Sequence, residues 1–193
     1  MEQPRETPIV CLGDSLTWGF PYGPEYSWVH IVKQRILEKR IVLVNRGING
    51  DTTEGMLERF DSSVCSQHPV AVIVLGGTND ILVRESLSRV EYNIEHIVAK
   101  ARENAIKIIL GLPIPLGWAE PERRLTRLRE WIRAYAQEHD LKCIDFAAPF
   151  YRAGSIEIRH EFYLDGGHPT KEGYQLMADQ VDLRLLQALI EPS

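Results

Sequence analysis

The sequence is poor in cysteine and has no excess of positive charge. Its 193 residues include three cysteines, Cys11, Cys65 and Cys143, and 22 lysines and arginines against 27 aspartates and glutamates, a formal net charge of −5. Three widely spaced cysteines do not form a disulfide or zinc framework, so we expect reduced thiols, with Cys11 and Cys143 inside buried strands. The acidic balance lacks the basic footprint of a nucleic-acid-binding protein, and we expect no nucleic-acid partner.

Long hydrophobic runs are also missing. The longest, VAVIVL at residues 70–75, is far shorter than the roughly 20 apolar residues that a membrane-spanning helix needs. The first eight residues, MEQPRETP, are polar and do not have the basic start and apolar stretch of a signal peptide. We therefore predict no membrane span and a cytoplasmic location.

Motifs for metals and nucleotides are equally scarce. His160 begins the string HEFYL, in which Leu164 stands where a zinc-binding H-E-x-x-H helix has its second histidine. The glycine-rich phosphate-binding motifs G-x-G-x-x-G and G-x-x-x-x-G-K-[ST] do not occur. The expected protein therefore uses no metal and no cofactor.

Apolar runs typical of strands alternate with helical patterns along the whole chain. The predicted strands cover residues 8–13, 40–47, 70–77, 106–113 and 142–146. Between and after them, apolar residues recur every three or four positions, as in helices, at 90–101, 125–136 and 174–189. Strands that are apolar throughout are typical of a parallel sheet covered on both faces. Because no linker or repeat interrupts the pattern, we predict an α/β fold in a single domain, residues 1–193.

Polar residues of catalytic type follow several of these strands. They lie in GDS (13–15), GINGDT (47–52), GGTND (76–80) and LDGGHPT (164–170). The carboxyl ends of parallel strands meet at one edge of a sheet, where ligands bind. Taken singly, Ser15, Asp51, Thr52 and Asp80 are better explained as helix N-caps. Capping alone does not explain why they occur together with a histidine.

The combination suits nucleophilic catalysis on a carbonyl group. A serine hydroxyl becomes a nucleophile when a base takes its proton, and a carboxylate improves that base by orienting it. Asp165 and His168 are three residues apart, so the carboxylate can hold one ring nitrogen while the other faces Ser15. The oxyanion formed by the attack needs fixed donors. The same edge offers the N–H groups of Ser15 and Gly50 and the side-chain NH2 of Asn79.

Four of these segments together resemble a known family. GDSL (13–16), NGDT (49–52), GTND (77–80) and DGGHP (165–169) are similar, in order, to the four sequence blocks of the GDSL or SGNH esterases and lipases. The resemblance implies a flavodoxin-like, three-layer α/β/α sandwich with a five-stranded parallel sheet. It also implies Ser15 as nucleophile, His168 as general base and acid, Asp165 as its orienting carboxylate, and an oxyanion hole of Ser15, Gly50 and Asn79. Asn49 departs from the family pattern, since many members carry serine there.

The expected substrate is a small-molecule ester, cleaved through an acyl-enzyme. Apolar side chains near the same loops predict a pocket for short or medium acyl chains or aryl groups, lined by Trp18, Ile81, Leu82, Leu116, Trp118 and Phe162. The family as a whole also covers lysophospholipids, thioesters and acetylated sugars, and the sequence does not select among them. The alternative is a flavodoxin-like protein that binds FMN or another phosphate at GDSLT. Two observations argue against this alternative. Trp18 stands in the first loop, where a flavin-binding loop usually has hydroxyl and glycine residues, and FMN binding would give His168 no role. The oligomeric state stays open.

Overall fold

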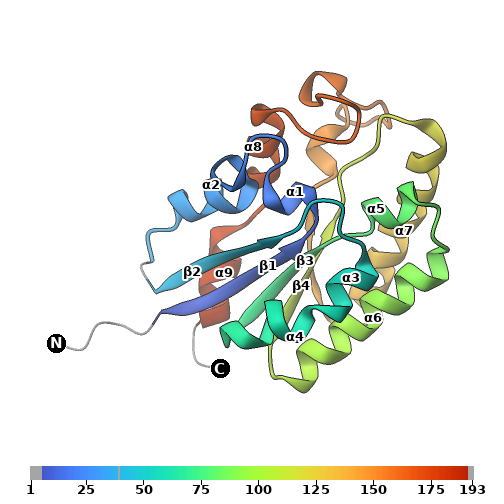
Figure 1. Cartoon of the computed structure of the whole chain (residues 1–193). Helices are drawn as coiled ribbons and strands as arrows, with labels where there is room; N and C mark the ends of the chain where they lie inside the picture. The colour runs from blue at the N-terminus through green and yellow to red at the C-terminus, as the bar shows by residue number, and fades with distance from the viewer. Residues whose placement is uncertain (1–5, 39, 191–193) are drawn as a thin grey trace.

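The computed structural model describes residues 6–38 and 40–190 and contains a five-stranded parallel sheet (Figure 1). Its strands, in the spatial order β2-β1-β3-β4-β5, are β1 (Thr7–Gly13), β2 (Ile41–Gly47), β3 (Ala71–Leu75), β4 (Lys107–Leu112) and β5 (Lys142–Asp145). All five predicted strands are confirmed. The third ends earlier than predicted because Gly77, with φ of +100°, already caps the next helix.

Helices cover both faces of the sheet, which gives the predicted three-layer α/β/α sandwich (Figure 1). One face packs against α1 (Ser15–Trp18), α2 (Trp28–Arg35), α8 (Lys171–Asp179) and α9 (Leu183–Ile190). The other packs against α3 (Thr53–Glu58), α4 (Phe60–Ser63), α5 (Thr78–Leu82), α6 (Leu87–Glu103) and α7 (Ala119–Glu138). Single 3-10 turns are η1 (Pro24–Tyr26), η2 (Cys65–Gln67), η3 (Ala148–Phe150) and η4 (His160–Phe162).

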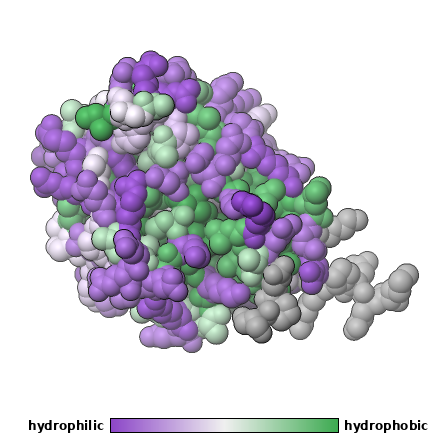
Figure 2. Space-filling model, turned by 180° about the vertical axis from the view of Figure 1, so that it is seen from behind, coloured by the Kyte–Doolittle hydropathy of each residue, from purple (hydrophilic) through white to green (hydrophobic). Residues whose placement is uncertain are grey.

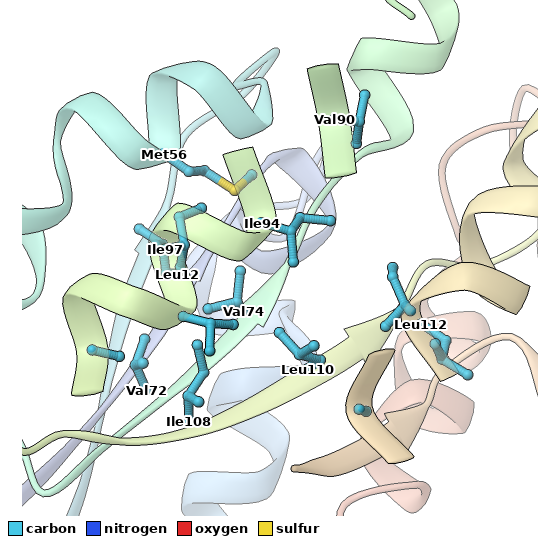
Figure 3. Packing of buried hydrophobic residues seen from close by; sticks show 14 of the residues in the cluster. Leu12, Met56, Val72, Val74, Val90, Ile94, Ile97, Ile108, Leu110 and Leu112 are labelled. Atoms are coloured by element: carbon cyan, nitrogen blue, oxygen red, sulfur yellow. The ribbon is translucent and has the colours of Figure 1, made fainter. Parts of the chain in front are cut away.

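Two hydrophobic cores, one on each face, explain why the central strands are apolar throughout. Successive side chains of a strand point to opposite faces. In β1, Ile9 and Cys11 therefore join the core under α2 and α8, whereas Val10 and Leu12 join the core under α3 and α6. Figure 3 shows part of the second core, where side chains from three strands meet those of α3 and α6. Fully burying each such side chain stabilises the fold by about 1.5–3 kcal/mol.

The last helical pattern is not one helix. The apolar spacing over 174–189 predicts a continuous helix, but the structure has α8 and α9 with a break at residues 180–182. The break occurs because the Asp182 carboxylate accepts the backbone N–H of Arg184 at 2.9 Å and so starts a new helix. The apolar stripe still faces the sheet, since Leu186 is fully buried.

The cysteines follow the prediction only in part. All three are free thiols, and Cys11 is buried as expected. Cys143 is exposed, so its placement in a buried strand was wrong. The reason is its position in β5, the last strand at the edge of the sheet.

The described part of the chain contains neither a membrane-spanning helix nor a cluster of metal-binding side chains. Over 6–38 and 40–190, none of the helices is both long and apolar enough to cross a bilayer. In the same ranges, no three side chains of His, Cys, Asp or Glu are grouped so that they could hold a metal ion. Figure 2 shows a mixed polar and apolar surface on the side opposite to the view of Figure 1. The cytoplasmic location stays a prediction.

The strand order places the polar loops together. The chain moves from β1 outward to β2 and then returns to β3 on the other side of β1. Ligands bind at the point where the strand order reverses, outside the carboxyl ends of the strands. Ser15 follows β1 and Asn79 follows β3, so these two residues flank that point.

Candidate active site

Ser15 is the first residue of α1, and a single residue, Asp14, separates it from the end of β1. The N-cap of this short helix is Asp14, whose Oδ1 accepts the Leu16 N–H at 2.9 Å. Ser15 is therefore not the capping residue, and its hydroxyl is free for another partner. The phenol of the buried Tyr174 supports the same turn, because it donates to the Phe20 carbonyl at 2.7 Å.

The partner of the Ser15 hydroxyl is His168. The distance from Ser15 Oγ to His168 Nε2 is 3.2 Å, across 153 positions of sequence. On the other side of the ring, His168 Nδ1 lies 2.8 Å from Asp165 Oδ2. The structure thus brings together all three residues for which the sequence predicts catalytic roles. Ser15 as a residue is 7% exposed, whereas the His168 and Asp165 side chains are more exposed, so the line of contacts leads from a nearly buried serine toward the surface.

The Asp165 carboxylate is fixed by the tight loop that carries it. Its Oδ1 accepts the backbone N–H groups of Gly167 at 2.9 Å and of His168 at 2.7 Å. Partial burial acts to raise the pKa of Asp165, but the hydrogen bonds from the His168 ring and these two N–H groups outweigh it and hold the pKa below its usual value. Asp165 therefore stays ionised at neutral pH, with Oδ2 directed at Nδ1. A carboxylate in this place favours the ring tautomer with the proton on Nδ1 and leaves Nε2 as an acceptor.

Hydrogen-bond donors lie on the loops beside Ser15. Within the described residues, the N–H groups of Ser15 and Gly50 donate to no protein acceptor. Gly50 has φ of +78°, and a Cβ placed there would have no atom within 4 Å, so the glycine is required by its backbone conformation and not by lack of space. The Asn79 side chain donates from Nδ2 to the Asp51 carbonyl at 2.9 Å. An amide nitrogen has two hydrogens, and among the described residues the second one has only a long contact, 3.5 Å, to Asp14 Oδ2.

The remaining capping candidates divide between structural roles. Thr52 is the N-cap of α3 and accepts the Gly55 N–H. The buried Asp80 accepts both the backbone N–H and the hydroxyl of Thr53. Asp51 forms an ion pair with Arg59 instead of capping a helix.

Asp14 is a buried carboxyl group next to the serine. It is 1% exposed, and among the residues that the structure describes its Oδ2 has only a long contact, 3.5 Å, to Asn79 Nδ2. Burial raises the pKa of Asp14 to about 7, the Leu16 N–H opposes this rise, and the nearby carboxylates of Asp51 and Asp80 add to it. At neutral pH, Asp14 is therefore partly protonated.

This raised pKa predicts that stability falls as the pH rises. In an unfolded chain an aspartate titrates near about pH 4, so between about pH 4 and 7 the folded state holds more protons at Asp14. In this window the free energy of unfolding decreases by up to about 1.4 kcal/mol per pH unit. Asp14→Asn keeps an acceptor for the Leu16 N–H and removes the titration, so urea unfolding of the variant should depend less on pH. Asp140→Asn, at an exposed site, is the control. Identical pH dependence of wild type and Asp14→Asn would contradict the assignment.

Only part of the predicted substrate pocket lies at the surface. Trp118 and Leu82 are exposed, at 45% and 42%, and Trp18 is half-buried. The placement of Ile81 and Leu116 in this pocket was wrong, because both are buried in the hydrophobic core, at 1% and 0% exposure. Phe162 packs partly buried against the other core, under the Arg159 guanidinium. An apolar residue next to a catalytic segment can point into the hydrophobic core or toward the site, and the geometry of its helix or turn decides between these directions.

Two aromatic rings lie against the histidine loop. The Phe20 ring packs on the His168 ring with 4.7 Å between centroids. The Trp118 indole lies over Gly166 and Gly167, where a Cβ on either glycine would come within 3.4 Å of it. The Gly117 N–H also donates to the Gly166 carbonyl at 2.7 Å, so the loop after β4 braces the loop that holds Asp165 and His168.

Comparison with known proteins identifies the family of this chain. A sequence profile of the GDSL-like lipase/acylhydrolase family matches residues 11–176. The chain belongs to this family. As a member, it is a carboxylic ester hydrolase, and this favours hydrolysis over the FMN-binding alternative.

Several relatives cover nearly the whole chain of this GDSL-family hydrolase. A Desulfitobacterium hafniense protein assigned to the G-D-S-L lipolytic family has 31% identity and a TM-score of 0.81, covering 91% of this chain and 97% of its own. The thioesterase 1/protease 1/lysophospholipase L1 of Escherichia coli is 25% identical, covering 94% of this chain and 84% of its own. The esterase TesA of Pseudomonas aeruginosa is 23% identical, covering 88% and 83%.

Three residues that support the site of this GDSL-family hydrolase were missed at the sequence level. They are Asp14, which caps α1, Arg59, which holds Asp51, and Tyr174, which supports the turn after Ser15. Asp14 belongs to the GDSL segment, but the sequence does not show that Asp14, and not its neighbour Ser15, is the N-cap of the helix. Arg59 gave no signal, because an arginine near the end of a short helix is typical of a solvated surface.

Proposed function

We propose that this chain hydrolyses carboxylic esters through an acyl-enzyme on Ser15, with His168 as general base and acid and Asp165 as its orienting carboxylate. The observation that carries the proposal is the continuous line of contacts from Ser15 Oγ to His168 Nε2, 3.2 Å, and from His168 Nδ1 to Asp165 Oδ2, 2.8 Å. Acyl transfer needs a proton to move between Ser15 Oγ and His168 Nε2, while the Asp165 carboxylate orients the ring and stabilises its cation. In this proposal a single domain, residues 1–193, carries the activity.

The proposed first half-reaction forms the acyl-enzyme. His168 Nε2 takes the hydroxyl proton as Ser15 Oγ attacks the ester carbonyl, and the ring becomes a cation next to the Asp165 carboxylate. The carbonyl oxygen becomes an oxyanion, which accepts hydrogen bonds from the N–H groups of Ser15 and Gly50 and from the second N–H of Asn79, which gives up its long contact to Asp14. Collapse of this intermediate breaks the ester bond, and His168 returns its proton to the departing alcohol.

The second half-reaction repeats the first with water. Water loses a proton to His168 Nε2 and attacks the acyl carbon, and the same three donors hold the oxyanion. The carboxylic acid leaves, and the proton on His168 returns to Ser15 Oγ. Every step uses side chains and N–H groups of this chain, so the proposal needs no metal or cofactor.

The proposed substrates have short or medium acyl chains or aryl groups. Support comes from the exposed apolar side chains around the site, Phe20, Leu82 and Trp118, since apolar surface beside a reactive group favours apolar substrate parts. The relatives of this chain include an arylesterase of Vibrio mimicus and a thioesterase/lysophospholipase of Escherichia coli, and both activities fit such a surface. We propose a small-molecule ester as the partner.

A panel of p-nitrophenyl esters with increasing acyl length tests both the reaction and the substrate class. We expect turnover of the short and medium esters. Trp118→Ala is expected to raise KM by up to about tenfold, because removing an indole from a substrate contact costs on the order of 1 kcal/mol. Tyr92→Ala, at a ring equally exposed at 45% but on α6, is the matched control. Equal KM values for both variants would remove Trp118 from the substrate site, and no turnover of any ester would contradict the proposed reaction.

A further inference from the structure

Arg59 lies at the end of α3, and its side chain reaches the carboxyl ends of two strands. Its Nη2 donates to the carbonyl of Gly13, the last residue of β1, at 3.1 Å, and to the carbonyl of Arg46 in β2 at 2.9 Å. The side chain is only 15% exposed. The guanidinium thus ties β1 and β2 together directly beneath the loops that carry Ser15 and Gly50.

The same guanidinium holds Asp51. Arg59 Nε and Nη2 lie 2.8 Å and 2.7 Å from Asp51 Oδ2, and the Asp51 side chain is 10% exposed. A third residue shapes this contact, because a Cβ on Gly55 would stand 2.2 Å from Asp51 Oδ1. The absence of a side chain at position 55 therefore leaves room for the carboxylate to meet Arg59.

Asp51 connects this ion pair to the oxyanion donors. It follows Gly50 directly in the chain, and its carbonyl accepts the Asn79 side-chain N–H at 2.9 Å. The loop is closed by the Asp51 N–H, which donates to the Ile48 carbonyl, and Ile48 in turn donates to Gly13. Through Asp51, Arg59 is therefore linked to both proposed donors. Asp51 is the neighbour of Gly50 in the loop, and its carbonyl orients the side chain of Asn79.

We propose that Arg59 is a positioning residue for ester hydrolysis: it fixes Asp51, and thereby holds the Gly50 N–H and the Asn79 side chain in place relative to Ser15. The inference rests on the proposed function and goes beyond it, since Arg59 itself touches no reacting atom. A planar guanidinium is needed because three acceptors from three segments converge on it, and an ammonium group does not reproduce that arrangement. Displacing a donor by about 1 Å is enough to cost on the order of 10²-fold in rate.

The first test measures kcat and KM of Arg59→Met and Arg59→Lys on a p-nitrophenyl ester. We expect kcat to fall by about 10- to 100-fold with KM changed little, because the donors act on the transition state more than on the bound ester. Arg59→Lys should recover only part of the loss. Arg89→Met is the matched control, since Arg89 is an exposed arginine that pairs with Glu54 of the same α3 helix at 2.6 Å. An Arg59→Met enzyme with the kcat of Arg89→Met would overturn the inference.

A double-mutant cycle separates positioning from a general loss of stability. In an Asn79→Ala background one of the positioned donors is already absent, so Arg59→Met should cause a smaller further loss of kcat than in wild type. Equal losses in both backgrounds would overturn the inference. Gly55→Ala serves if Arg59→Met does not fold, because it retains Arg59 and displaces Asp51. It is expected to lower kcat in a folded protein, and full kcat would again overturn the inference.

Ser15→Ala distinguishes failure of the inference from failure of the proposed function. If Ser15→Ala retains turnover, the proposed function fails and the role of Arg59 fails with it. If Ser15→Ala is inactive and Arg59→Met is fully active, only the role of Arg59 is wrong.

Discussion

Ser15→Ala is expected to abolish ester turnover, with kcat lower by on the order of 10⁴- to 10⁶-fold. The substitution removes the atom to which the acyl group becomes attached in the proposed mechanism. The measurement is steady-state hydrolysis of a p-nitrophenyl ester, with the uncatalysed rate subtracted. The fold should persist, since the hydroxyl lies at the edge of the sheet and contributes at most about 1 kcal/mol to stability.

The control for this substitution is Ser66→Ala. The Ser66 hydroxyl is exposed and donates to the Ser62 carbonyl on the opposite end of the sheet from the site. Its variant should keep wild-type kcat and KM. Turnover by Ser15→Ala within tenfold of wild type would contradict Ser15 as the nucleophile, whatever the effect on stability.

Asn79→Ala is expected to lower kcat by about 10²- to 10³-fold. The side chain supplies one of three donors to the oxyanion, and its own orientation is set by the Asp51 carbonyl at 2.9 Å. Because the donor acts on charge that develops only after attack, KM should change much less than kcat. Kinetics on one ester, measured where circular dichroism shows the variant folded, give both values.

Asn104→Ala is the matched control, since Asn104 is an exposed amide whose side chain donates to the Lys100 carbonyl at the end of α6. Its kinetic constants should equal those of wild type. If Asn79→Ala lowers affinity and leaves kcat unchanged, Asn79 binds substrate and is not an oxyanion donor.

The sheet could be predicted from the sequence because a strand that is buried on both faces is apolar at every position. Val70 to Leu75 is apolar at every position, which a half-exposed strand would not be. The helical break at Asp182 could not be predicted in the same way. The apolar spacing continues on both sides of it, and only the local hydrogen bond to Arg184 shows that the helix restarts.

The candidate site was predictable where its chemistry requires particular residue types. Ser15, His168 and Asp165 lie within hydrogen-bond distance in the structure, although 153 positions separate the first two. The substrate side was less predictable, because apolar residues serve cores and pockets equally well. Ile81 precedes Leu82 by one position on α5, yet Ile81 is buried and Leu82 is exposed. The direction in which each side chain points from the helix, and not its residue type, decides whether it is buried or exposed.

Arg59 shows a further limit of the sequence. Its importance lies in two backbone carbonyls and one carboxylate that come from three different segments. Backbone acceptors leave no trace in residue identity. Only the assembled strands reveal that a single guanidinium can reach all three.

Covalent trapping tests the central claim most directly. The protein is incubated with diethyl p-nitrophenyl phosphate, digested, and the modified peptide is identified by mass spectrometry. The account predicts one diethylphosphoryl group per chain on Ser15, with loss of esterase activity in proportion to labelling, no label in Ser15→Ala, and much slower labelling in His168→Ala. A fully inhibited protein with an unmodified Ser15, or a label on another residue that tracks the loss of activity, would contradict it.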